Sequence, residues 1–175
     1  VAGFTVVLVT RNGTLKKMED DRKTFIDMLG PGVIALIFYA GHGFMINGSN
    51  CMIPVDFDPI TSEAVSLDRT LQCMEEKKTR VNIGIADACR EVLDLGVGVS
   101  GFTPPPPPAN STLIFATSAG SGASDGSSNG LFTHHLIKAL RMPRKLHECM
   151  MITKRNVWTA SNGKQLPNVS DSLTV

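Results

Sequence analysis

The chain has 175 residues, enough for one domain with a sizeable core, and its 17 basic and 16 acidic side chains give a formal net charge of +1. This balance gives no indication of a nucleic-acid or anionic-membrane partner. No run of about 18 apolar residues predicts a membrane span, and no secretory signal is visible, so we expect a cytoplasmic protein. Four cysteines without metal-ligand spacing indicate reduced thiols, and we expect no metal or other cofactor; they are Cys51, Cys73, Cys89 and Cys149.

The first part of the chain predicts a strand, a helix and a second strand. Residues 4–9 are a β-branched run that ends before an Asn-Gly turn. Thr14 is the expected N-cap of a helix over residues 15–29, which a Gly-Pro-Gly segment ends. Residues 33–40 form the next predicted strand. This order predicts a right-handed crossover with parallel pairing.

The rest of the chain continues the alternation, so the fold class is α/β and residues 1–175 form a single domain. Residues 96–112 form a predicted Pro/Gly-rich loop with five successive prolines, which a surface connector explains better than an SH3-type ligand. The other predicted elements are a hairpin over residues 43–55 about Asn47 and Gly48, helices over 64–78, 130–141 and 145–158, strands over 81–90 and 113–117, and an edge strand over 165–173.

Two of the predicted strands end on reactive side chains. Residues 33–43 (VIALIFYAGHG) carry His42, and residues 81–90 (VNIGIADACR) carry Cys89, 47 positions later. Ligands of open α/β sheets bind beyond the carboxyl ends of the strands. A cysteine and a histidine delivered to that edge suit a nucleophile and its base. Either residue alone is more simply a buried thiol or a core histidine.

The chemistry expected of this pair is acyl transfer. Cys89 attacks a carbonyl as a thiolate, while His42 acts as general base and then as acid to the leaving amine. Backbone N–H groups near Gly43 or after Cys89 are candidates for holding the oxyanion.

Asp87 lies two positions before Cys89, so strand alternation predicts that both side chains face the same side. A carboxylate there raises the pKa of a neighbouring thiol and so does not activate it. Its better use is to select a substrate with Arg or Lys before the scissile bond. The alternative is an Asp that caps a turn or pairs with Arg90.

These motifs resemble a known family. Residues 38–43 (FYAGHG) with residues 87–90 (DACR) resemble the caspase-like cysteine peptidases of clan CD, peptidase family C14. Asp87 stands where caspases that cut after aspartate have glutamine, which resembles paracaspases and metacaspases. Residues 51–56, 115–120, 130–133 and 163–167 extend the resemblance over most of the chain.

The resemblance implies a three-layer α-β-α sandwich with a mostly parallel central sheet, and a peptidase that cuts after Arg or Lys. His42 and Cys89 match the catalytic pair and Asp87 the pocket acid. Asp125 falls near a second pocket acid, although an Asx turn explains it equally well. The groove strand supplies Ala116, Thr117 and Ser118, beside Gly43, as substrate-binding residues.

Family domains begin with a further strand and helix, which this sequence lacks. We therefore expect impaired folding or activity of the chain alone, unless upstream sequence or a partner supplies the strand. The absence of Lys and Arg between Glu91 and Thr112 fits a single-chain enzyme activated as a homodimer better than a self-cleaving one.

Two other function classes stay open. One is a catalytically silent caspase-fold interaction module. The other is nucleotide binding by the glycine-rich residues 118–126, although these lack both the G-x-G-x-x-G pattern and a P-loop lysine.

Overall fold

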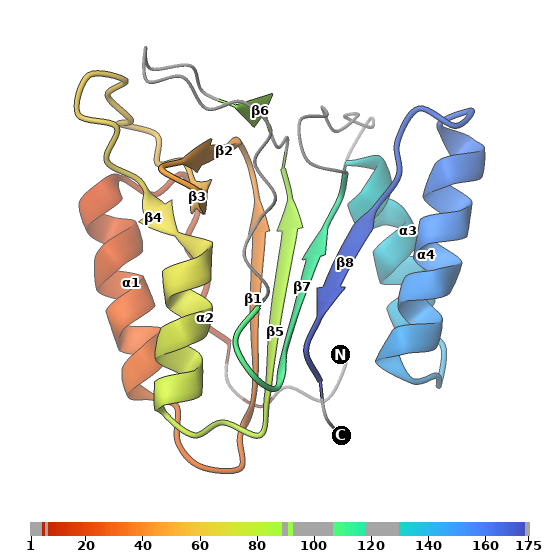
Figure 1. Cartoon of the computed structure of the whole chain (residues 1–175), viewed down its shortest axis with the longest axis horizontal. Helices are drawn as coiled ribbons and strands as arrows, with labels where there is room; N and C mark the ends of the chain where they lie inside the picture. Colours follow the sequence, from red (N-terminus) through yellow and green to blue (C-terminus); the bar gives the residue numbers. More distant parts are fainter. Residues whose placement is uncertain (1–4, 6, 89–90, 93–106, 118–129, 174–175) are drawn as a thin grey trace.

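A computed structural model describes residues 5, 7–88, 91–92, 107–117 and 130–173 of the chain. Four helices and eight strands lie in this part (Figure 1). They are α1 (Leu15–Asp27), β1 (Ile34–Ala40), β2 (Gly43–Ile46), β3 (Ser49–Met52), β4 (Val65–Ser66), α2 (Leu67–Glu76), β5 (Val81–Asp87), β6 (Glu91–Val92), β7 (Ser111–Phe115), α3 (Leu131–Leu140), α4 (Leu146–Ala160) and β8 (Asn168–Asp171).

The main sheet has the strand order β1-β5-β7-β8 and separates two pairs of helices. β1, β5 and β7 are parallel, and β8 is antiparallel to β7. Strand alternation divides the core, because Leu113 and Phe115 of β7 pack toward α1 and α2, whereas Ile114 packs toward α3 and α4. The chain therefore forms the three-layer α-β-α sandwich with a mostly parallel sheet that the family resemblance implies.

A second, smaller sheet lies beyond the carboxyl ends of β1 and β5, at the top of Figure 1. Its strand order is β4-β3-β2-β6, and β2 and β3 form an antiparallel hairpin. The turn residues Asn47 and Gly48 have φ values of 48° and 77°, the left-handed conformation that Asn-Gly turns adopt in two-residue hairpins. The hairpin prediction is confirmed.

Side chains cap the two helices on the left of Figure 1. The Thr14 hydroxyl accepts a hydrogen bond from the Lys17 backbone N–H at the start of α1, as the sequence predicts. Asp56 adds a second acceptor there, at 2.7 Å from the Leu15 backbone N. Ser66 caps α2 in the same way, through the Arg69 N–H.

The predicted strand over residues 4–9 is wrong in the part that the structure describes. Residues 7–10 form no strand, and Val7 and Val9 are 74% and 64% exposed. The first crossover predicted from that strand is therefore absent as well. A β-branched run becomes a strand only where a neighbour accepts and donates its backbone hydrogen bonds, and none of the described strands pairs with this one.

The predicted Pro/Gly-rich loop also ends earlier than expected. β7 begins at Ser111, so the last two residues of the predicted loop belong to the sheet. Residues 96–106 lie outside the described residues, as do residues 118–126 of the glycine-rich stretch.

One face of β1 is only partly covered by the described residues, since Leu36 packs against the core under α3 and α4. Ile34 and Phe38 alternate with the residues that pack on α1 and α2, and they are 49% and 45% exposed. The helices on that side of the sheet, α3 and α4, pack over β5 and β7 instead. Apolar burial in this protein is therefore concentrated away from its β1 edge.

This asymmetry predicts different costs for two phenylalanine substitutions. Phe132 of α3 is fully buried, so Phe132→Ala should lower the free energy of unfolding by about 3–5 kcal/mol. Phe38→Ala is the matched control, and its cost should stay below about 1.5 kcal/mol because half of the side chain is already in water. Urea unfolding of both variants measures the difference, and equal costs would contradict the packing described above.

Candidate functional site

His42 is held by its backbone and exposed at its side chain. It lies in the two-residue link between β1 and β2, beyond the carboxyl end of β1. Its carbonyl oxygen accepts hydrogen bonds from the Tyr39 hydroxyl at 2.7 Å and from the Ile53 backbone N–H at 3.1 Å. The imidazole is thus presented to solvent from an anchored peptide.

The register of the strands is the same on both sides of this link. In the main sheet Ala40 pairs with Asp87, and in the small sheet Phe44 pairs with Glu91. Each pair is separated by 47 positions, and both pairings are parallel. The Gly41 N–H continues the first ladder by donating to the Asp87 carbonyl at 3.2 Å. Cys89 and Arg90, between the two pairings, lie outside the described residues.

Asp87 ends β5 with its half-buried carboxylate at the N-terminus of α3. Its Oδ2 accepts a hydrogen bond from the Thr133 backbone N–H at 3.2 Å. Gly130, at the N-cap position of α3, has no side chain to do this, so Asp87 acts as the cap from another element. A Cβ on residue 130 would lie 2.5 Å from Oδ2, so glycine is needed there for the carboxylate to fit.

A second polar group beside Asp87 was missed by the sequence analysis. The Thr133 hydroxyl is buried, and among the buried polar side-chain atoms that the structure describes it alone has no hydrogen-bond partner. Covalent geometry keeps it within a few ångströms of its own N–H and hence close to the Asp87 carboxylate. Sequence showed Thr133 only as the start of a helix, and no pattern in it marks an unpaired hydroxyl.

The remaining predicted substrate-binding residues are only partly described. Gly43 begins β2 and is buried. Ala116 and Thr117 follow β7 and are also buried. The Ala116 N–H donates to the Ala86 carbonyl, and its own carbonyl accepts from the Gln165 side chain, so this peptide is already bonded within the protein. Ser118 and Asp125 lie outside the described residues.

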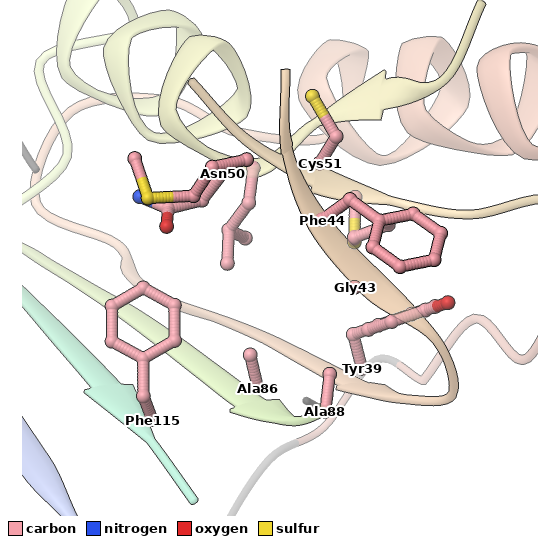
Figure 2. Close-up of a pocket in the computed structure, with 11 residues that line it drawn as sticks. Tyr39, Gly43, Phe44, Asn50, Cys51, Ala86, Ala88 and Phe115 are labelled. Atoms are coloured by element: carbon pink, nitrogen blue, oxygen red, sulfur yellow. The ribbon is translucent and has the colours of Figure 1, made fainter. Parts of the chain in front are cut away.

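A small apolar pocket lies between the two sheets (Figure 2). Tyr39 and Ala88 line one end and Phe115 the other, and Gly43 and Cys51 also contribute. Neither His42 nor Asp87 lines it. Burial, with a smaller contribution from the charge of Asp68, raises the pKa of the Cys51 thiol above its ordinary value. A thiol kept neutral in this way is a poor nucleophile.

The other two described cysteines lie on helices, outside this pocket. Cys149 is buried in α4 and its Sγ donates to the Ala139 carbonyl, and Cys73 lies on α2, where Arg22 contacts it at 3.9 Å.

In the described ranges, no three His, Cys, Asp or Glu side chains are grouped to hold a metal ion. Nor does any helix traced there have the length and apolar character to cross a bilayer.

Comparisons with known proteins identify relatives of this chain. The chain is 32% identical over 166 residues to human mucosa-associated lymphoid tissue lymphoma translocation protein 1, covering 90% of this chain and 20% of that protein. Its mouse homolog is 32% identical over 128 residues, covering 70% of this chain and 15% of that protein. The chain thus spans about a fifth or less of the length of these relatives.

The fold has a counterpart among solved structures. Caspase-1 from Spodoptera frugiperda superposes with a TM-score of 0.72 at 18% sequence identity, covering 99% of this chain and 73% of that one. The model of the caspase domain matches residues 2–175 of the sequence. The chain therefore belongs to the caspase domain family, the C14 family of cysteine peptidases.

Proposed function

We propose that this chain is a cysteine endopeptidase that cuts after Arg or Lys, with Cys89 as nucleophile and His42 as general base. The observation that carries the proposal is the common register on both sides of the β1–β2 link. The pairings before and after it have the same 47-residue offset, which equals the separation of His42 and Cys89 in the sequence. Family membership supports the same pair.

The proposed reaction is acyl transfer in two steps. The Cys89 thiolate forms a bond to the carbonyl carbon as the C–N bond breaks, and His42 protonates the amine that leaves. His42 then removes a proton from water, which attacks the thioester and releases the carboxylic acid and the thiol. Backbone N–H groups near Gly43 are candidates for stabilising the oxyanion.

The preference for basic residues rests on Asp87. Its carboxylate lies at the carboxyl end of β5 and accepts a hydrogen bond from one backbone N–H in the described part. The unpaired Thr133 hydroxyl beside it is a second acceptor for a cationic side chain. Both groups can accept hydrogen bonds from an arginine guanidinium or a lysine ammonium, and the Asp87 carboxylate repels an aspartate.

Fluorogenic peptides ending in Arg, Lys or Asp test this proposal directly. We expect turnover of the Arg and Lys peptides only, abolished by Cys89→Ala or His42→Ala and unchanged by Cys73→Ala, the matched removal of a part-exposed thiol on α2. Turnover after Asp alone would overturn the proposed pocket.

The reactivity of the Cys89 thiol distinguishes a peptidase from a catalytically silent interaction module. In the wild-type chain, iodoacetamide should modify Cys89 faster than Cys73, and His42→Ala should remove that difference. Equal rates at the two thiols, with no turnover of any peptide, would favour the interaction module.

Two substitutions separate the two roles of Asp87, which are to cap α3 and to attract a basic substrate side chain. Asp87→Asn keeps an acceptor for the Thr133 N–H but removes the charge, so stability should be retained while kcat/KM for Arg peptides falls about 10- to 100-fold. Asp87→Ala also removes the cap of α3 and should cost about 1 kcal/mol of unfolding free energy. Urea unfolding and peptide kinetics of both variants measure this. Arg turnover that survives Asp87→Asn would assign Asp87 a capping role alone.

A further inference from the structure

The Tyr39 hydroxyl forms hydrogen bonds with the backbone of His42, in the link between β1 and β2, and with the backbone of Ile53. Its hydroxyl lies 2.7 Å from the His42 carbonyl oxygen and 3.1 Å from the Ile53 carbonyl oxygen, and it accepts a hydrogen bond from the Ile53 N–H at 3.1 Å. Ile53 directly follows β3. One side chain therefore joins the end of β1, the peptide of His42 and the far strand of the hairpin.

The same phenol limits what residue 41 can be. A Cβ on Gly41 would lie 2.6 Å from the Tyr39 hydroxyl oxygen and 2.9 Å from Cζ. The Gly41 N–H meanwhile bonds the Asp87 carbonyl. The link is thus fixed on one side by the ladder to β5 and packed on the other against the phenol.

The phenol keeps the proton that it needs as a donor. Burial raises the pKa of Tyr39 above its ordinary value, and the backbone hydrogen bond from Ile53 opposes this only in part. Tyr39 is also the single tyrosine of the chain, and its ring packs against the core that α1 and α2 cover.

We propose that Tyr39 is a positioning residue for the reaction, which fixes the backbone of His42 and so limits where the exposed imidazole can lie. This inference rests on the proposed function for its catalytic meaning. His42 has few side-chain constraints, because it is exposed, so its placement depends on its peptide. A displacement of about 1 Å in a catalytic group can lower a rate about 100-fold.

Tyr39→Phe tests the inference, because it keeps the packed ring and removes only the hydroxyl. We expect kcat for an Arg peptide to fall about tenfold while KM changes by less than about twofold, since the Tyr39 hydroxyl bonds the His42–Gly43 peptide, which carries the proposed base and a candidate oxyanion donor, and not Asp87. The matched control is Thr153→Val, which removes a buried hydroxyl that donates to the Cys149 carbonyl at 2.8 Å within α4, on the other side of the sheet. The control should lose comparable stability in thermal unfolding and keep its kcat.

Nuclear magnetic resonance provides a second measurement that needs no turnover. The chain has four histidines, and the three others lie on α3 and α4, where they serve as internal references. Tyr39→Phe should shift and broaden the imidazole resonances of His42 alone. This spectral result decides whether Tyr39 holds His42 whether or not the wild-type chain turns over a peptide. An unchanged kcat together with unchanged His42 resonances would overturn the inference.

Discussion

The parallel pairing of β1 with β5 is the constraint on which the candidate site depends. Seven residue pairs fix its register, from Ile34 with Val81 to Ala40 with Asp87. A slip of one residue would reverse the faces of every side chain on a strand, so the buried core specifies this register strongly. The pairing of Phe44 with Glu91 then repeats the same offset in the small sheet. Two ladders with one offset therefore hold the chain on both sides of His42.

Asp87 shows how closely stability and recognition are joined at this edge of the sheet. Its carboxylate caps α3, which favours a negative charge at the helix N-terminus, and the same charge is the proposed attraction for a basic substrate. The helix dipole weakens that attraction but fixes the carboxylate in place. Gly130 permits the approach, and the Thr133 hydroxyl is left buried without a partner. A buried hydroxyl without a hydrogen-bond partner lowers the stability of the fold. Such unpaired groups are a common feature of binding sites.

Much of the fold could be predicted from the sequence because its signals are local. The Asn47-Gly48 turn, the Thr14 cap and the apolar runs of β1 and β5 each depend on neighbours in the chain. The strand expected over residues 4–9 was wrong because a strand also needs a partner, which local sequence does not reveal. The contact of Asp87 with Thr133 joins residues 46 positions apart, and only the sandwich brings them together. The bond from Tyr39 to Ile53 has the same non-local origin.

His42 illustrates how an exposed side chain is positioned without being buried. The imidazole needs access to substrate and water, so packing around it cannot hold it. The protein instead constrains the peptide, through the Tyr39 hydroxyl and the Ile53 N–H on its carbonyl, and through the Gly41 N–H on the carbonyl of Asp87. Because these hydrogen bonds form with the fold, the cost of ordering the link is met before substrate arrives. The exposed imidazole is therefore positioned through hydrogen bonds to its own peptide and to the peptide of the neighbouring Gly41.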